Sequence, residues 1–350
     1  MSSKLMIALG VLVALIGLVA LQFNAENAAD KQGPTVEVVL PKVEKDAVDR
    51  LEVSAPEKTP VTIVKDGESE AGWKLIAPVE AMAAKTAIDT ALGKLEELEM
   101  TAVAATKKEN HERLEVTKEK GIHVLAKQGD KVVADIWVGA YRSGNTMVRK
   151  EGEDPVAAVK GSIRFAFDKD VKEWRDRTIT DLAEADIGAV TLENEKGTLR
   201  FEKDGEAYKQ AEGQKPIPEF DAAKVKSLVG TAAHLRAVDF GKPDVTLASA
   251  GVDDACKTKV FLELAGDAGQ SQVALYVGNQ VDGNYYLRRE GDDVLYQVSS
   301  FMGGRLAQGP DDFKKDPPPE GNPAAAAAPM PGGPGQPQMV FPKQVIPGHP

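Results

Sequence analysis

Two stretches of the chain place apolar residues at the three- and four-residue spacing of an amphipathic helix. The apolar stripes are Ile88, Leu92, Leu95 and Leu98 in the first stretch, and Val225, Leu228, Val229, Ala232 and Leu235 in the second. This spacing predicts a helix over about 84–99 and another over about 221–236, each with one buried face. Asp221 stands at the start of the second stretch, where its side chain suits the N-cap.

Each predicted helix is followed by four short segments of β-forming residues. The segments cover 122–127, 132–138, 146–150 and 156–159 in the first half of the chain, and 259–264, 272–277, 285–289 and 294–298 in the second. Turn-forming residues separate them, among them Gly-Asp, Ser-Gly-Asn and Gly-Glu-Asp. Short strands that follow one another across tight turns predict an antiparallel meander after each helix.

A β-rich run followed by Asp-Gly precedes each predicted helix. The runs are 61–64 and 199–202, and Lys-Asp-Gly-Glu follows them at 65–68 and 203–206. Asp-Gly suits the positive φ angles of a two-residue turn, so a β-hairpin is expected at both places. Trp73 and Tyr208 come after the turns and are expected to be buried or half-buried packing residues.

The two halves repeat one another with a period of about 138 residues. Besides the hairpin motif, the matching stretches are Trp137-Val138-Gly139 with Tyr276-Val277-Gly278, and 145–152 with 284–291. We therefore predict a tandem duplication in which both copies have the same strand order, with Gly139 and Gly278 at equivalent strand ends. Each copy, over 46–178 and 183–308, is expected to be an α+β unit made of a β-hairpin, one helix and an antiparallel β-meander.

The N-terminus carries an uncharged apolar run from Leu5 to Leu21. As a helix this run spans about 25 Å, close to the thickness of a bilayer core. Lys4 precedes it and Glu26 follows, a charge bias that favours a cytoplasmic N-terminus and an exported remainder. Residues 1–23 are expected to be a transmembrane anchor, with a cleaved signal peptide or a buried core helix as the alternatives.

The two ends of the remaining chain have a biased composition. Residues 24–45 are expected to be a tether. Residues 309–350 are expected to be a disordered tail, because sequences rich in Pro, Ala and Gly bury too little surface to fold. The formal net charge of −11 argues against nucleic acid as a partner, since phosphate binding needs a basic surface.

The chain offers few residues for catalysis. Its four histidines show no metal-ligand spacing, and His111 beside Glu112 is expected to be a solvated polar pair. The single cysteine, Cys256, excludes an internal disulfide, and a nucleophilic thiol would also need a positioned base. Neither a phosphate-binding Gly-x-x-x-x-Gly-Lys-Ser/Thr loop nor a Gly-x-Ser-x-Gly elbow occurs. We therefore predict no catalytic residue, no cofactor and no metal site.

Charged residues that occur at matching places in both copies form the candidate interaction surface. They are Arg149 and Glu151 in the first copy and Arg288 and Glu290 in the second. The alternative is a charged strand end that discourages edge pairing. Trp174 is added to this surface, because its Arg- and Asp-rich setting suits stacking on an arginine or capping of the junction between the copies.

Several stretches together are typical of a known bacterial family. They are the N-terminal apolar run, Gly-Trp-Lys-Leu-Ile-Ala-Pro at 72–78, Val-Gly at 138–139, and Glu-Trp-Arg-Asp-Arg-Thr at 173–178. Over about residues 5–305 the chain resembles the envelope family called domain of unknown function 4340. The family often has Gly-Leu-Asp before the meander. Here Gly251-Val252-Asp253 takes that place in the second copy and Arg113-Leu114-Glu115 in the first.

Members of this family are often encoded beside ABC-type transporters of the gliding-motility or auxiliary type. The resemblance therefore implies a non-catalytic accessory or scaffold protein, associated with an ABC-transporter permease or another envelope protein. Its anchor would lie in the inner membrane and its soluble part on the periplasmic side. An envelope hydrolase with a site between the copies, and a structural or adhesive surface protein, are the alternatives.

Overall fold

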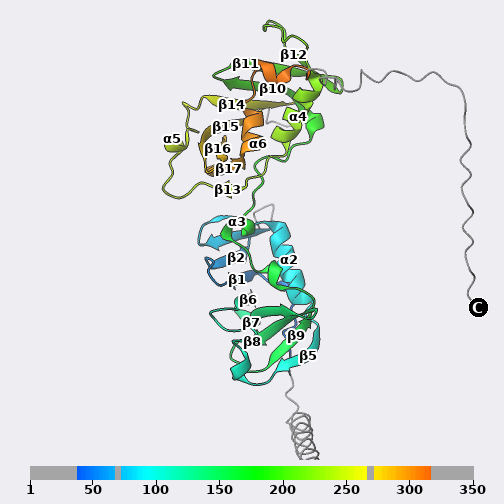
Figure 1. Ribbon diagram of the computed structural model, residues 1–350, viewed down its shortest axis with the longest axis vertical. Coiled ribbons are helices and arrows are strands. Elements are labelled where there is room, and N and C mark those ends of the chain that lie inside the picture. Colours follow the sequence, from blue (N-terminus) through cyan, green and yellow to red (C-terminus); the bar gives the residue numbers. More distant parts are fainter. Residues whose placement is uncertain (1–37, 68–71, 266–271, 317–350) are drawn as a thin grey trace, which may run out of the picture.

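The computed structural model describes residues 38–67, 72–265 and 272–316 of the chain. The predicted anchor over 1–23 and most of the predicted tail lie outside these ranges. Within the described ranges, no helix is long and apolar enough to cross a membrane. The described chain forms two units that lie end to end and are joined by one segment of chain (Figure 1).

The first unit is built on one antiparallel sheet of nine strands. In chain order these are β1 (Arg50–Ser54), β2 (Val61–Lys65), β3 (Trp73–Ala77), β4 (Ala81–Met82), β5 (Met100–Ala105), β6 (Ile122–Gln128), β7 (Lys131–Arg142), β8 (Asn145–Lys150) and β9 (Val156–Lys160). The helices are α2 (Lys85–Glu96) and α3 (Val171–Trp174), with 3₁₀ turns η1 (Lys45–Ala47), η2 (Lys108–Asn110) and η3 (Arg164–Ala166). The strands lie in the order β4-β3-β2-β1-β6-β7-β8-β9-β5.

The second unit is built on an antiparallel sheet of eight strands. They are β10 (Ile187–Asn194), β11 (Gly197–Asp204), β12 (Ala207–Gln210), β13 (Asp239–Phe240), β14 (Thr258–Leu264), β15 (Gln272–Val281), β16 (Asn284–Arg289) and β17 (Tyr296–Ser299). The helices are α4 (Ala222–Ala233), α5 (Leu247–Ala250) and α6 (Ser300–Leu306), with 3₁₀ turns η4 (Glu184–Asp186) and η5 (Pro310–Phe313). The strands lie in the order β12-β11-β10-β14-β15-β16-β17-β13.

The two sheets share one strand order once β4 is set aside. β1, β2 and β3 correspond to β10, β11 and β12, β5 corresponds to β13, and β6 to β9 correspond to β14 to β17. The internal repeat predicted from the sequence is therefore confirmed, and all the predicted meander strands are present. The sequence pattern missed β1 and β10, which join the hairpin and the meander into a single sheet, and it missed the edge strands β5 and β13.

The hairpin prediction is confirmed in the second unit and needs correction in the first. β11 and β12 meet at a tight turn in which Asp204 pairs with Ala207 and Gly205 has a φ of +66°. Between β2 and β3 the connection is longer. The hydrogen bond of 2.9 Å that closes it runs from Asp66 N to Gly72 O, two residues that lie six positions apart in the sequence. The two-residue turn expected at the first Asp-Gly is therefore wrong.

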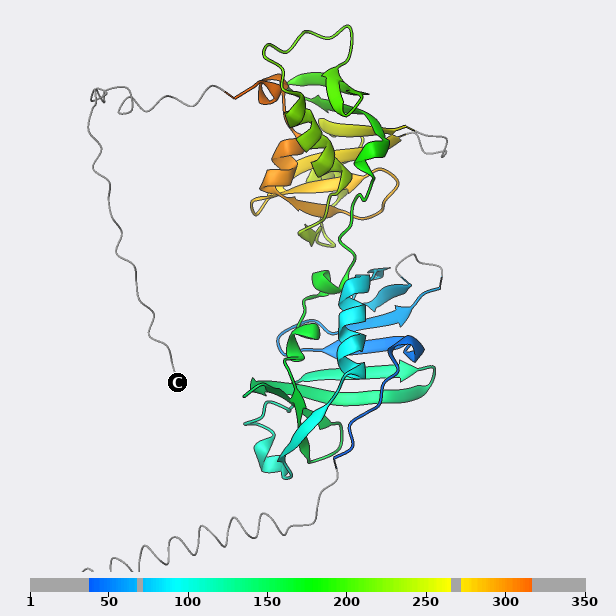
Figure 2. The same cartoon turned by 90° about the vertical axis from the view of Figure 1, so that its right-hand side faces the viewer.

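The two long helices lie across one face of their sheets, as Figure 2 shows. Their buried residues are Ile88, Ala91, Leu92 and Leu95 in α2, and Val225, Leu228, Val229, Ala232 and Ala233 in α4. Asp221 caps α4 as predicted, because its Oδ1 accepts a hydrogen bond of 2.9 Å from Ala223 N. Leu98 and Leu235 lie beyond the helix ends and still pack against the two main cores.

A long loop covers the other face of each sheet and forms a second, smaller core with it. The loops are 106–121 and 241–257. At Gly139 and Gly278 an added Cβ would overlap a loop carbonyl oxygen and lie 2.7 Å from a valine Cγ1. The carbonyl oxygen belongs to Leu114 in the first unit and to Ala250 in the second, and the valines are Val116 and Val252. The glycines are equivalent, but they lie at bulges inside β7 and β15 rather than at strand ends.

This contact also corrects the alignment of the Gly251-Val252-Asp253 stretch. Gly251 has a φ of +73°, and the residue in the same place in the first unit is Glu115, with a φ of +58°. The stretch therefore corresponds to Glu115-Val116-Thr117, two residues later than the sequence alignment placed it. A left-handed conformation is required at this point of both loops, and glycine supplies it in only one of them.

Both units end in the same way. Trp174 at the end of α3 and Phe313 at the end of η5 are fully buried. Their carbonyl oxygens accept hydrogen bonds of 2.8 Å from Ala84 N and Asp221 N, just ahead of the two long helices. Trp174 thus closes the core of the first unit, and its place in an exposed interaction surface is wrong.

The structure moves three predicted boundaries. Val38 and Val43 are buried in the core of the first unit, so this unit begins within the predicted tether. Ile179 is buried in the core of the second unit, which therefore begins before residue 183. The burial of Phe313 extends the second unit into the predicted tail, and the described chain continues to Asp316.

The junction between the units is made by α3, the residues that follow it, and β13. The Arg175 guanidinium carbon lies 3.5 Å from the centre of the Phe240 ring. Lys172 Nζ lies 3.0 Å from a carboxylate oxygen of Asp239. A main-chain hydrogen bond of 2.7 Å from Ala237 N to Arg177 O joins the residues just before β13 to those that follow α3. The first unit thus covers the edge strand of the second.

Candidate functional site

The repeated charged residues lie on the loop-covered face of each sheet, in rows that cross three strands. In the second unit, Tyr276 on β15 lies between Lys259 on β14 and Arg288 on β16, its partners in the strand register. Lys259 Nζ and the Arg288 guanidinium carbon lie 5.3 and 4.5 Å from the ring centre. The Tyr276 hydroxyl donates a hydrogen bond of 3.3 Å to Glu290 Oε1. Two cations thus contact one aromatic ring, with a carboxylate at its edge.

The first unit has the same arrangement. Trp137 on β7 lies between His123 on β6 and Arg149 on β8. The His123 and Trp137 rings stack with centres 4.7 Å apart, and the Arg149 guanidinium carbon lies 5.8 Å from the Trp137 ring centre. Trp137 Nε1 donates a hydrogen bond to a Glu151 carboxylate oxygen. A histidine here takes the place of the lysine in the second unit.

The two arginines fasten the loops to the sheets. Arg149 and Arg288 have side chains only 11% and 16% exposed, so they offer little surface to a partner. Arg149 Nε donates a hydrogen bond of 3.1 Å to Val116 O, and Arg288 pairs with Asp254 at 3.6 Å, both within the loops. Burial lowers the pKa of Arg149 from its ordinary value.

The carboxylates of the two rows remain accessible. Glu151 and Glu290 are exposed at the rim of their sheets. Comparison of the two copies therefore matched the repeated residues correctly. However, it assigned largely buried arginines and exposed glutamates to one interaction surface. It missed His123 and Lys259, because only the strand register shows that they flank the aromatic rings.

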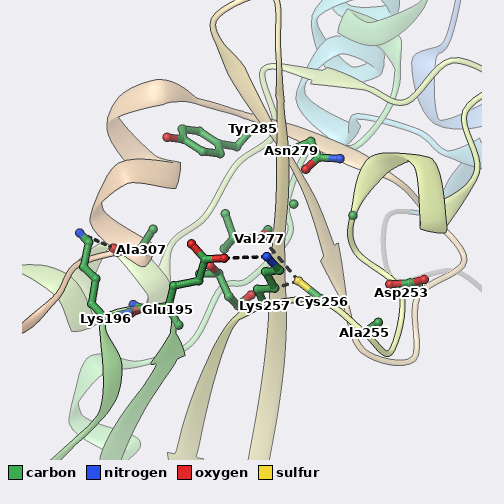
Figure 3. Close-up of a pocket in the computed structure, with 14 residues that line it drawn as sticks. Glu195, Lys196, Asp253, Ala255, Cys256, Lys257, Val277, Asn279, Tyr285 and Ala307 are labelled. Carbon is green, nitrogen blue, oxygen red and sulfur yellow. Dashed lines mark hydrogen bonds and ion pairs between the residues drawn. The ribbon is translucent and has the colours of Figure 1, made fainter.

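A cavity of about 600 Å³ opens in the second unit between the β10–β11 turn and the loop before β14 (Figure 3). Charged residues of opposite sign line it and pair with one another or with main chain. Lys257 Nζ donates a hydrogen bond of 2.7 Å to Glu195 Oε1, which lowers the pKa of that carboxyl. Lys196 Nζ donates a hydrogen bond of 3.2 Å to Ala307 O. The same ion pair raises the pKa of Lys257, so Glu195 and Lys257 both stay charged and are poorly suited to transfer protons.

Cys256 lies at the wall of this cavity and is buried. Its Sγ lies 3.3 Å from Thr258 O and 3.4 Å from Val277 O, and its single S–H can donate to either oxygen. Burial raises the pKa of the thiol above its ordinary value of 9.0. Since the thiolate is the reactive form, this cysteine is structural in the native state.

Alkylation of Cys256 provides a direct check. At pH 7.5 we expect iodoacetamide to label native protein at least about tenfold more slowly than protein unfolded in urea, because the native thiol is buried and less ionised. Mass spectrometry of timed samples would measure both rates. Equal rates would show that the thiol is open and reactive.

The described histidines have structural contacts. His111, predicted to be solvated, is instead buried, and its Nε2 lies 2.7 Å from Asp154 O. His234 Nδ1 lies 3.1 Å from an Asp181 carboxylate oxygen. Among the residues that the structure describes, no group of three or more His, Cys, Asp or Glu side chains is arranged to hold a metal ion.

The fold and the rows of side chains define the chain as a tandem α+β repeat protein with internally paired polar groups. Residues 73–255 and 220–318 match the family model described as a domain of unknown function (DUF4340). Together the two matches extend over more than half of the chain, so the chain belongs to this family. No curated protein and no solved structure gives a significant match.

Proposed function

We propose that the chain is a non-catalytic accessory or scaffold protein of an ABC-type transport system. Its N-terminal apolar run would anchor it in the cytoplasmic membrane, with both units on the extracytoplasmic side. In this role the two units hold binding surfaces at a distance from the membrane, and the permease of the transporter is the expected partner.

The observation that carries this proposal is the end-to-end arrangement of two units with one strand order (Figure 1). Two units placed end to end lengthen the molecule and present two similar outer surfaces along it, an arrangement that suits a protein that holds partners. The paired charges support the same reading. Lys257 is paired with Glu195, and Arg288 with Asp254, so each of these charges already has a partner within the chain.

The junction gives no specific support to a hydrolase with a site between the units. Such a site needs polar groups that converge on a substrate. At the junction Arg175 is instead stacked on Phe240, and Lys172 is paired with Asp239. We therefore keep the accessory role as the single proposal.

Co-purification from membranes tests the proposed function. The full-length chain with a C-terminal affinity tag would be extracted in mild detergent, and its companions identified by mass spectrometry. We expect an ABC-transporter permease to be enriched about tenfold or more over an exported control in which residues 1–23 are replaced by a cleavable signal peptide. The absence of any ABC-transporter subunit from the anchored sample would contradict the proposal.

A further inference from the structure

The strand β5 forms the outer edge of the first sheet. It pairs with β9 on one side and is last in the strand order, so within the described ranges its other side has no strand partner. All six of its residues are uncharged, and Met100 and Val103 are each 41% exposed. An uncharged edge strand is a template for another strand, which soluble proteins usually protect with charges, bulges or a covering segment. The pairing of β5 with β9 has two register shifts, but β5 carries no charge of its own.

The second unit shows how the equivalent edge is protected. Val103 pairs with Ala157 and Phe240 pairs with Tyr296, which occupy the same place in the two sheets. Phe240 is only 8% exposed, because its ring packs into the second unit's core beside Tyr296 and the Arg175 guanidinium of the first unit lies over it. The edge of the second unit is thus covered by the first unit, whereas β5 has no preceding unit among the described residues to cover it.

From this contrast we propose that β5 is a docking strand for an extended, uncharged segment in the extracytoplasmic part of a membrane protein. The segment would add to the sheet edge through main-chain hydrogen bonds, the mode known as β-augmentation. Ala102 and Val103 would face small or aliphatic side chains, because a charged side chain at this place would lose its hydration without a partner.

A second copy stacked in the manner of the two units does not fit β5. The residue that corresponds to Arg175 at the end of the second unit is Lys314, since each forms an antiparallel bridge just ahead of a long helix. On β5 that lysine would meet Ala102 and Val103, which take the places of Asp239 and Phe240. At the natural junction Lys172 pairs with Asp239 and Arg175 stacks on Phe240. The ring and the carboxylate that hold the natural junction are absent.

The location of β5 also selects the partner, and this step rests on the proposed function. The described chain begins at the end of the first unit where β5 and β9 lie (Figures 1 and 2). If the preceding residues form the anchor, β5 faces the membrane. An antiparallel pair of two β5 strands would extend the copies in opposite directions from the shared edge, so both copies would not stand on one face of a membrane.

Photo-crosslinking in native membranes tests this inference. A photoreactive amino acid would replace Ala102 in the full-length anchored chain, and crosslinked peptides would be sequenced. We expect an adduct with an extracytoplasmic loop of an integral membrane protein. Adding Val103→Lys should lower its yield about tenfold, because a lysine on an edge strand opposes pairing. The matched control is Val132→Lys, at a valine that is 49% exposed on β7, and it should leave the yield within about twofold.

The outcomes separate this inference from the proposed function. An adduct with an ABC-transporter permease supports both. An adduct with another membrane protein, sensitive to Val103→Lys and not to Val132→Lys, supports the docking strand and overturns the transporter assignment. An adduct with a second copy of the chain overturns the docking strand and leaves the proposed function standing. The same holds if no adduct forms while a permease still co-purifies with the chain. Loss through misfolding would be recognised by circular dichroism of each variant.

Discussion

Replacing Trp174 by alanine is expected to lower the free energy of unfolding of the first unit by about 3–5 kcal/mol, the range for removing a large buried aromatic. The side chain is fully buried in the main core of that unit. Its main chain also holds the start of α2, because Trp174 O accepts a hydrogen bond from Ala84 N. The cavity left by the substitution would therefore loosen both the core and the closure of the unit.

Trp174→Phe is the matched control. The indole Nε1 is buried without a hydrogen-bond partner, so phenylalanine removes a polar group that forms no bond and leaves a smaller cavity. We expect it to cost less than half as much as alanine. Urea unfolding followed by circular dichroism would measure both values. A loss below about 1 kcal/mol for Trp174→Ala would contradict the closing role that burial assigns to this residue.

Gly139→Ala and Gly278→Ala should each destabilise their own unit by about 2–3 kcal/mol, since overpacking of this size forces the backbone to move. In both cases the new methyl group would overlap a carbonyl oxygen of the covering loop. Gly93→Ala is the control in α2, where an added Cβ meets nothing within 4 Å. It should raise stability by up to about 1 kcal/mol, the usual gain for alanine over glycine in a helix.

Fluorescence can assign these effects to the separate units. All three tryptophans, at 73, 137 and 174, lie in the first unit, so tryptophan emission reports its unfolding alone. Gly139→Ala should shift that transition to lower urea. Gly278→Ala should instead shift the far-ultraviolet circular dichroism of the second unit. Movement of both transitions by the same amount in either variant would mean that the two units unfold as one.

The features that could be predicted from the sequence are those set by neighbouring residues. The stripes of α2 and α4, the cap at Asp221 and the meander strands all depend on spacings of a few residues. The strand β1 was missed although Leu51 and Val53 alternate with polar residues, because so short an alternation is a weak signal until its pairing with β6, far along the chain, is known. β5 was missed because Met-Thr-Ala-Val-Ala-Ala has no alternation of apolar and polar residues.

The candidate site shows the same limit. Comparison of the copies matched Arg149 with Arg288, but it gave no sign that both side chains are largely buried. Their burial results from the loops that cover this face of each sheet, and a loop of irregular structure has no periodic pattern to read. The rows that include His123 and Lys259 follow from the register between strands, which distant residues determine.

The shared ending of the two units has a consequence for the evolution of the gene. Arg175 and Lys314 stand directly after the closing aromatics Trp174 and Phe313, at equivalent bridges. A recombination between these two codons leaves an intact core on each side, because each unit carries its own closing residue. Unequal crossing-over at this point therefore removes or adds one whole unit per event. Exchange at equivalent places within the sheets would instead set strands of different units beside each other, such as β1 and β14, and the hybrid core would have to repack.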